Sequence, residues 1–333
     1  TPDPIDFQSM LRRMADAGIQ DVVMEVSAHA LALRKVEGMF FDVAGFTNFS
    51  QDHLDFFGDM ESYLATKLKL FAPEKCGFAI YNADDERAAE AMKKIGVQAR
   101  SIGIRAPAEV YANDIEVTER GCSYKLTFNK RYRMSLELQL SGIFNVYNSM
   151  MAAAMCDALG LGREAIREGL ERVKIVPGRI ELLDTETPYR VILDYAHSPD
   201  ALENILQTVR QTAKARVICV FGCGGDRDHE KRPIMGEIGG RLADYCILTS
   251  DNPRSEDPLA ILEEVENGIR KVEDAQYCVI ENRRAAIYEA LKMAKPGDVI
   301  VLAGKGHETY QEIKGVKHPF DEKVVVRQLL SQI

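Results

Sequence analysis

Runs of apolar and polar residues divide the first half of this chain into segments of helix and strand length. Apolar side chains recur at helical spacing within residues 6–17, which predicts an amphipathic helix. Short apolar runs at 21–26, 40–46 and 78–81 have the length of buried strands, and residues 144–159 form a longer helical segment rich in Ala and Met. This order of elements predicts a mixed α/β unit.

Two further patterns complete the predicted architecture. Residues 110–140 alternate apolar and polar with turn signals, which favours antiparallel strands added to a parallel sheet. After residues 176–179 (VPGR), where Pro and Gly interrupt the pattern, strands and helices alternate in the manner of a doubly wound, Rossmann-like α/β domain. We therefore expect two domains, residues 1–177 and 178–333. The strands of the second are expected at 190–195, 216–221, 244–249, 276–280 and 298–302, and its helices at 200–212, 233–242, 258–271 and 283–293.

The composition excludes several classes of protein. Apolar residues make up 46% and charged residues 28% of the 333 positions, as in ordinary globular proteins. A net charge of -9 argues against nucleic acid as a partner, because phosphate contacts need clustered Lys and Arg. Apolar runs stay below the about 18 residues of a membrane-spanning helix, so no membrane insertion is expected. The seven cysteines form no CxxC pair, and several lie in apolar strands, which is typical of a cytoplasmic protein.

Four polar motifs of the second half each follow directly on a predicted strand. Ligands of open α/β sheets bind at the carboxyl ends of the strands, so these motifs predict one composite site. Alternatively, each motif is only a loop with a helix cap, a role open to Ser198, Asp200 and Asp257. The motifs are DYAHSPDAL (194–202), FGCGGDRDHEKRP (221–233), SDNPRSEDP (250–258) and AGKGHETYQ (303–311).

The DNPR sequence at 251–254 favours recognition of an amino acid. Pro253 fixes its own φ and biases Asn252 toward an extended conformation, which stiffens the loop. Arg254 could pair a carboxylate through two parallel hydrogen bonds, while Asp251 and Asn252 accept from an ammonium. A rigid surface turn with solvated charges remains the alternative for this loop.

Two residues of the neighbouring motifs extend this interpretation. Arg227 offers a second guanidinium and Glu308 a second acceptor, so the set suits a ligand with both carboxylates and amines, such as a diamino diacid. The GCGG sequence at 222–225 could instead suggest dinucleotide binding, but it lacks the third Gly that opens a helix in such turns.

In the first half, residues 47–67 (TNFSQDHLDFFGDMESYLATK) form a polar loop before a helix. Asp59 is the expected N-cap of this helix, which carries Lys67. Glu25 and His53 lie near predicted strand ends and could share magnesium ions with phosphate oxygens. A cationic Lys67 would be repelled by the metal, whereas a carbamylated lysine is anionic, although the sequence alone does not lead to that modification.

Together these motifs resemble the Mur ligase family of peptidoglycan synthesis, and they are most similar to members that add meso-diaminopimelate. DNPR resembles the signature that selects diaminopimelate over lysine. The implied fold is a truncated central ATPase domain, with a mixed sheet flanked by helices, followed by a Rossmann-like doubly wound C-terminal domain. Besides the four motifs above, the resemblance rests on MEVSAHAL (24–31), FTNFSQDHLDFFGDMESYLATK (46–67), YNADDE (81–86), GIFNVYNSMMAA (142–153) and VPGRIE (176–181).

The resemblance implies an ATP-dependent acid–amino-acid ligase of cell wall biogenesis, with consequences for cell shape and division. Its substrates would be UDP-N-acetylmuramoyl-L-alanyl-D-glutamate (UDP-MurNAc-L-Ala-D-Glu) and meso-diaminopimelate. The D-glutamyl γ-carboxylate would attack the γ-phosphate of ATP to give an acyl phosphate, which the amine then attacks. Catalysis would be positioning and charge neutralisation. The resemblance also implies Mg²⁺, CO₂ as a carbamate on Lys67, and a cytoplasmic monomer.

Motif matching carries the family's functional residues onto this sequence in four groups. Glu25, His53 and carbamylated Lys67 would be the catalytic and metal-binding residues; Asn145, Arg179, Asp194 and His197 would contact the nucleotide; Arg227, Asp251, Asn252, Arg254, Gly304 and Glu308 would bind diaminopimelate; and Thr1, Ser27 and Lys35 would face the UDP-muramoyl dipeptide.

The sequence also departs from the family pattern. It contains neither the GTNGKT-type phosphate loop nor the amino-terminal domain that holds the uridine end, so we expect it to begin just after that loop. Because the loop cradles phosphates, we expect these 333 residues alone to be inactive and to bind ATP poorly. Ala28 stands where a second Ser is common, and Leu33 and Lys35 stand where Gln and Arg often face substrate.

Three other functions remain open. DNPR argues against a lysine-adding or other amino-acid ligase of the same family. A non-catalytic binding module would have no use for Glu25, His53 and Lys67 together. A nicotinamide oxidoreductase would have to bind its dinucleotide at residues 222–225.

Overall fold

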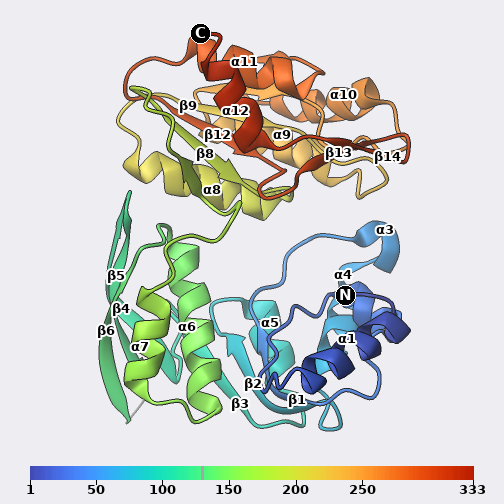
Figure 1. Ribbon diagram of the computed structural model, residues 1–333, viewed down its shortest axis with the longest axis vertical. Coiled ribbons are helices and arrows are strands. Elements are labelled where there is room, and N and C mark those ends of the chain that lie inside the picture. Colours follow the sequence, from blue (N-terminus) through green and yellow to red (C-terminus); the bar gives the residue numbers. More distant parts are fainter. Residues whose placement is uncertain (129–130) are drawn as a thin grey trace.

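The computed structural model describes residues 1–128 and 131–333, and it contains two six-stranded sheets (Figure 1). The first sheet has the order β1-β2-β3-β4-β5-β6, and the second has the order β11-β10-β9-β12-β8-β7. All strands of the first sheet precede residue 177, so we propose to keep the division between the units at 177/178. In the described part of the chain, no helix is long and apolar enough to cross a membrane.

The first unit has the mixed sheet that the sequence predicts. Strands β1 to β4 are parallel, and β5 and β6 are added antiparallel, as expected for residues 110–140. Its strands are β1 Phe41–Phe46, β2 Cys76–Asn82, β3 Ala99–Gly103, β4 Val110–Thr118, β5 Gly121–Phe128 and β6 Tyr132–Leu138. Its helices are α1 Pro4–Asp16, α2 Ala28–Ala32, α3 Leu54–Phe57, α4 Met60–Leu68, α5 Glu86–Met92, α6 Ile143–Ala158 and α7 Arg163–Glu171, with a short 3-10 turn at Lys69–Phe71.

The strand predicted at residues 21–26 is wrong. This segment has no regular structure, and Val23 is 96% exposed. An apolar run becomes a strand only where a neighbouring strand satisfies its backbone hydrogen bonds. Within the described ranges, β1 pairs with β2 on one side and lies at the edge of the sheet, so it does not pair with this run.

The second unit is doubly wound, which confirms the predicted class. Side chains alternate between the two faces of each strand. In β9, Val217, Cys219 and Phe221 pack with α8, α9 and α10, whereas Ile218 and Val220 pack with α11 and α12. Its strands are β7 Glu181–Leu183, β8 Arg190–Asp194, β9 Val217–Phe221, β10 Tyr245–Leu248, β11 Tyr277–Val279 and β12 Val299–Ala303, with a hairpin of β13 Tyr310–Ile313 and β14 Val316–Pro319. Its helices are α8 Pro199–Thr212, α9 Lys231–Leu242, α10 Pro258–Ile269, α11 Arg283–Met293 and α12 Glu322–Leu330.

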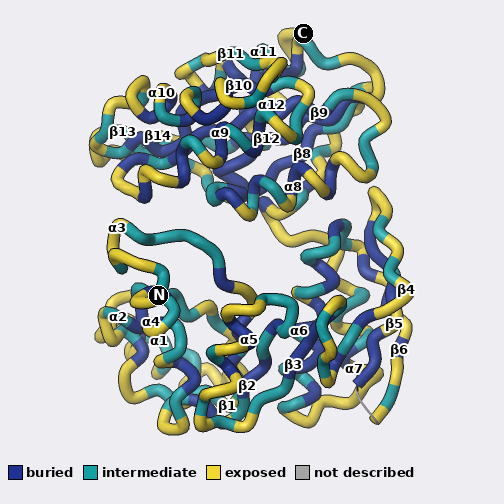
Figure 2. The backbone as a smooth tube through the Cα atoms, turned by 180° about the vertical axis from the view of Figure 1, so that it is seen from behind, coloured by how far each residue is buried: buried dark blue, intermediate teal, exposed yellow. Residues whose placement is uncertain are grey.

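The strand order places the four polar motifs on one edge of the second sheet. β12 inserts between β9 and β8, and the parallel strands β8, β9, β10 and β12 end directly before the motifs. A reversal of strand order opens a crevice at the carboxyl ends of the strands. The loop from β1 to α3 rises from the first unit toward this edge (Figure 2).

Candidate active site

The loop after β1 brings Asp52 and His53 to the junction of the two units. His53 has a left-handed φ of 59° and precedes α3, and its backbone N–H donates to Asp52 Oδ1 at 2.9 Å. Lys231 Nζ of the second unit lies 3.7 Å from Asp52 Oδ1. Burial would raise the pKa of Asp52, but the charges of Lys231 and His53 hold it below its usual value. Burial lowers the pKa of His53 and outweighs the charge of Asp52, which acts in the opposite direction. The lowered pKa favours a neutral imidazole.

Lys67, in the last turn of α4, is half-buried and feels the charges of Glu25 and Asp52. Asp59 caps α4 as predicted, accepting from Ser62 N at 2.7 Å, and Lys67 Nζ lies 5.0 Å from the Tyr63 ring centre. Burial lowers the pKa of Lys67, and the nearby charges of Glu25 and Asp52 offset this only in part. The Tyr63 ring lies near both Lys67 and His53, at 5.0 Å from Lys67 Nζ and 6.2 Å from the His53 ring centre, whereas the joint role of Glu25, His53 and Lys67 stays a prediction.

No three His, Cys, Asp or Glu side chains gather into a metal cage within residues 1–128 and 131–333. Magnesium is usually held by one or two carboxylates plus substrate phosphates rather than by an all-protein cage. Glu25 and Asp52 supply oxygen ligands of the type that Mg²⁺ prefers, so these residues fit the ion in kind.

A cavity of about 180 Å³ lies at the carboxyl edge of the second sheet, facing the loop after β1. It contains all six residues predicted to bind diaminopimelate, together with His53 from the first unit and His197. The two arginines therefore lie on one side of the sheet, in one site. The lining residues are Asp52, His53, Tyr195, His197, Gly224, Arg227, Lys231, Asp251, Asn252, Arg254, Gly304 and Glu308.

The hairpin β13–β14 holds the DNPR loop in place. Arg254 has a φ of 51°, and its backbone N–H donates to Glu312 O at 3.0 Å while Lys314 N donates to Arg254 O at 2.6 Å. Its Nη1 donates to Gly225 O at 2.6 Å. A Cβ on Gly224 would lie 2.9 Å from Arg254 Nη1, so glycine allows the guanidinium to cross this loop. The local sequence predicted the stiffness of the loop but not this long-range support.

Asn252 uses its side chain on partners within the protein. Its Oδ1 accepts from Lys305 Nζ and from Glu312 N, both at 2.9 Å, and its Nδ2 donates to Glu308 Oε2 at 3.0 Å. Its expected role as an acceptor for an ammonium stays a prediction, because the oxygen already has two donors. Lys305 was missed by sequence reasoning, although it lies inside the motif at 303–311.

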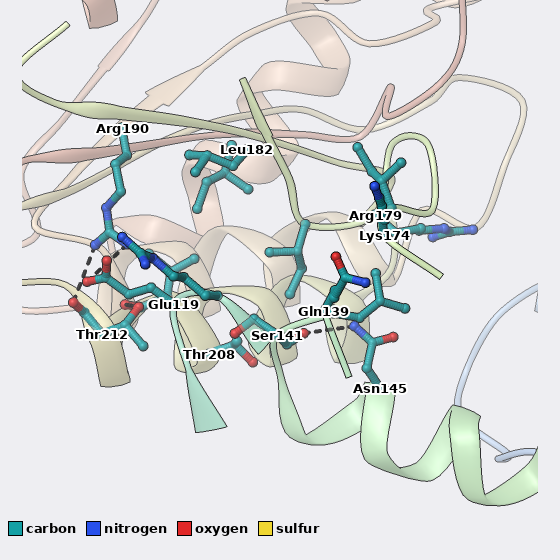
Figure 3. Close-up of a pocket in the computed structure, with 16 residues that line it drawn as sticks. Glu119, Gln139, Ser141, Asn145, Lys174, Arg179, Leu182, Arg190, Thr208 and Thr212 are labelled. Atoms are coloured by element: carbon teal, nitrogen blue, oxygen red, sulfur yellow. Dashed lines mark hydrogen bonds and ion pairs between the residues drawn. The ribbon is translucent and has the colours of Figure 1, made fainter. Parts of the chain in front are cut away.

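The residues predicted to contact a nucleotide are divided between two places. Asn145 and Arg179 line a second cavity, of about 320 Å³, between the units, where Arg179 and Lys174 lie at one end and Arg190 with Glu119 at the other (Figure 3). Asp194 and His197 are not among the described residues that line it.

The Asp194 carboxylate is buried and accepts from the backbone N–H groups of Ile180 at 2.8 Å and Ala196 at 2.9 Å. Burial raises its pKa. His197 lines the amino-acid cavity instead, and Arg179 stacks over the Tyr195 ring at 4.6 Å. Tyr195 therefore lies between the two cavities.

The three residues predicted to face the muramoyl substrate are not among the residues that line either of these two cavities in the described part of the chain. Thr1 is exposed, Ser27 Oγ caps α2 by accepting from Ala30 N at 3.2 Å, and Lys35 pairs with Asp3 at 2.9 Å. Their role stays a prediction.

Two family models match separate parts of the chain. Residues 1–156 match the family model of the Mur ligase middle domain, and residues 178–306 match that of the Mur ligase glutamate ligase domain. The chain belongs to the Mur ligase family. It is 44% identical over 333 residues to the UDP-N-acetylmuramoyl-L-alanyl-D-glutamate–2,6-diaminopimelate ligase of Syntrophomonas wolfei, covering 99% of this chain and 68% of the relative. The enzyme of the same name from Clostridioides difficile is 44% identical over 336 residues, covering 100% of this chain and 69% of the relative.

Solved structures agree with the Mur ligase fold. A ligase with the same name superposes with a TM-score of 0.64 at 33% identity, covering 100% of this chain and 69% of that one. MurF ligase from Thermotoga maritima, in complex with ADP, superposes with a TM-score of 0.67 at 16% identity, covering 92% of this chain and 65% of that one, and so supports the fold alone.

Proposed function

We propose that this chain carries the amide-forming and amino-acid-binding parts of the ATP-dependent ligase that adds meso-diaminopimelate to UDP-MurNAc-L-Ala-D-Glu. One observation carries the proposal: Arg227, Arg254, Asp251 and Glu308 line a single cavity whose far wall includes His53 of the other unit. Guanidinium forks pair carboxylates, and carboxylates accept from ammonium groups, so the cavity suits an amino acid with a second charged end. The names of the relatives support the same substrate.

The residues of the chain would act by positioning. Arg254 and Arg227 would take a carboxylate of diaminopimelate, and Glu308 would accept from its ammonium. The reacting amine would then meet the acyl phosphate at the junction of the units, where Lys231 supplies a buried cation beside Asp52. Orientation and neutralisation of negative charge, rather than a protein nucleophile, would lower the barrier.

Magnesium and a lysine carbamate belong to the proposal. Glu25 and His53 would hold the metal together with carbamylated Lys67, and the bound ion would neutralise phosphate charge. Burial lowers the pKa of Lys67, which favours the neutral amine. That amine can attack the carbon of CO₂ and lose a proton, so the side chain becomes an anion compatible with a metal.

The cavity of about 320 Å³ that Asn145 and Arg179 line is the proposed place of ATP. Arg120, Lys174, Arg179 and Arg190 line it against one acidic residue, Glu119, which suits a polyanion. Asn145, Asp194 and His197 would contact the nucleotide from the surrounding elements. The 333 residues include no GTNGKT-type loop, so we propose that they alone release no phosphate from ATP, which a phosphate-release assay would test.

We further propose a cytoplasmic monomer that serves cell wall synthesis, with Thr1, Ser27 and Lys35 toward the UDP-muramoyl dipeptide. All seven cysteines lie in the described part of the chain and are free thiols there, in keeping with a reducing compartment.

Isothermal titration of the 333-residue chain with meso-diaminopimelate and with L-lysine tests the proposal. Lysine lacks the second carboxylate, so the expected result is binding of diaminopimelate at least about tenfold tighter than lysine, or about 1.4 kcal/mol. Equal affinity for the two amino acids would contradict diaminopimelate as substrate. Absence of binding to both would contradict the amino-acid site itself.

A further inference from the structure

Lys305 lies at the centre of a buried polar cluster behind the amino-acid cavity. It follows β12 and Gly304, and its side chain is fully buried. Its Nζ donates to Asn252 Oδ1 at 2.9 Å, to Glu308 Oε2 at 3.0 Å and to Asp251 Oδ1 at 3.3 Å. All three ammonium protons are therefore used on residues that line the cavity, and two loops distant in sequence are joined through one side chain.

A second buried cation lies on the other side of Asp251. Arg283, the first residue of α11, donates from Nε to Glu322 Oε1 and from Nη2 to Ala303 O, both at 2.8 Å. Its Nη1 is buried without a hydrogen-bond partner among the described residues. A Cβ on Gly304 would lie 2.5 Å from Asp251 Oδ2 and 4.0 Å from Arg283 Nη1. The Asp251 carboxylate and the Arg283 guanidinium therefore both lie next to the Cα of Gly304. The Asp251 carboxylate is thus fixed between two cations.

The charges of this cluster do not balance. Lys305 and Arg283 are positive, whereas Asp251, Glu308 and Glu322 are acidic, which leaves one negative charge without a matching cation inside the cluster. Among the three acids, the Glu308 side chain is 16% exposed, against 7% for Asp251 and 0% for Glu322. The unmatched charge therefore reaches the cavity at Glu308, whose Oε1 faces Tyr195 Oη at a long 3.5 Å.

We propose that Lys305 is a positioning residue of the amino-acid site. Its three hydrogen bonds hold Asp251, Asn252 and Glu308 Oε2 in place, which leaves Glu308 Oε1 as the acceptor for the ammonium of the incoming amino acid. The ligand's ammonium supplies the missing positive charge, while Arg227 and Arg254 across the cavity take a carboxylate. This inference rests on the proposed function and adds to it the residue that positions the acceptors of the site.

Removal of the Lys305 charge tests the proposal through proton linkage. In Lys305→Met, Asp251 loses its nearest cation, and burial would then raise its pKa so that it takes up a proton. The proton returns the cluster to the net charge that it has with Lys305, but the three hydrogen bonds of the Lys305 ammonium are lost, so the acceptors of the site are no longer held in place. Loss of that proton at higher pH adds a negative charge that attracts the ligand's ammonium. The titratable groups that face Asp251 are Lys305, Arg283, Glu322, Glu308, His197, Tyr195 and Cys223.

Titration calorimetry with meso-diaminopimelate at pH 6.0 to 8.5 measures this linkage. We expect Lys305→Met to bind at least about tenfold more weakly than wild type at the lower pH and to recover part of the loss at the higher pH, since proton occupancy falls about tenfold per pH unit. Lys292→Met, at an exposed lysine of α11, is the matched control and should bind as wild type throughout.

The outcomes separate the two proposals. If wild type binds no diaminopimelate at any pH, the proposed function fails and this inference falls with it. If wild type binds and Lys305→Met binds equally well, or loses the same factor at every pH with an intact circular dichroism spectrum, only the inference is overturned. Should Lys305→Met not fold, Lys305→Gln, which keeps a donor without charge, carries the same test. Failure of both variants to fold would make Lys305 a structural residue and overturn the inference.

Discussion

Replacement of Gly304 by alanine should damage both stability and amino-acid binding. Gly304 has a φ of 115°, and a Cβ there would lie 2.5 Å from Asp251 Oδ2. A side chain in such a conformation costs about 1–3 kcal/mol in backbone strain. Relief of the contact requires the Asp251 carboxylate to shift, and because its Oδ1 accepts from Lys305 Nζ, the shift disturbs a buried charged hydrogen bond worth about 1.5–3 kcal/mol. We therefore expect Gly304→Ala to lower the free energy of unfolding by about 3–5 kcal/mol.

Gly315→Ala is the matched control, because it separates backbone strain from the collision. Gly315 also has a positive φ, of 75°, but a Cβ there would meet no atom within 4 Å. We expect this variant to lose only about 1–2 kcal/mol, which is the usual cost of a left-handed residue with a side chain, and to keep its affinity for diaminopimelate.

Urea denaturation followed by far-ultraviolet circular dichroism measures both variants, since the chain has no Trp for fluorescence. Titration calorimetry then gives their affinities, and we expect Gly304→Ala to bind meso-diaminopimelate at least about tenfold more weakly. Equal destabilisation in the two variants, with unchanged binding in Gly304→Ala, would refute the close contact between Gly304 and Asp251.

Three further predictions concern the charged residues. Arg254→Lys should weaken diaminopimelate binding about tenfold or more in calorimetry, because a point charge cannot replace a bidentate fork; wild-type affinity would contradict the assignment. Mass spectrometry of protein trapped under labelled bicarbonate should find a carbamate on Lys67, and its amount should increase with pH because more of the amine is then neutral. The Lys67→Arg variant should carry no label at this position, and equal label in both proteins would contradict carbamylation of Lys67. Arg283→Met should cost about 3–5 kcal/mol in urea denaturation because it leaves Glu322 buried and unpaired, and the double variant Arg283→Met with Glu322→Leu should recover most of that loss; an additive loss would contradict the pairing.

Local patterns predicted the elements whose signals are complete within a few residues. The alternation of strands and helices after residue 178 is present, and Asp59 and Asp257 both cap the helices that follow them. These features depend on side-chain periodicity and on one hydrogen bond to a nearby backbone N–H, so a single sequence reveals them.

Features set by distant partners were not predictable in this way. Residues 21–26 have the composition of a strand, but β1 does not pair with them among the residues described; Val22 and Val23 stay exposed, and only Met24 and Val26 pack against the core. The same limit applies to Lys305, Arg283 and Lys231. A charged residue is expected to be exposed, and only the fold shows that each of these cations is buried and paired with a carboxylate distant in sequence.

That the six residues proposed to bind diaminopimelate line one cavity was predictable, because the four motifs follow parallel strands of one sheet. Their individual roles were not, since Asn252 Oδ1 is already occupied by Lys305 and Glu312 N. The position of the motifs after parallel strands places their residues at one edge of the sheet. Which hydrogen-bond acceptors remain free depends on which side chains the fold brings next to them.

A structure of the 333-residue chain determined with bound meso-diaminopimelate tests the central claim most directly. The account predicts a ligand carboxylate within hydrogen-bond distance of Arg254 or Arg227, and an ammonium against Glu308, in the cavity that faces His53. A ligand bound elsewhere, or bound in this cavity with its ammonium away from Glu308, would contradict it.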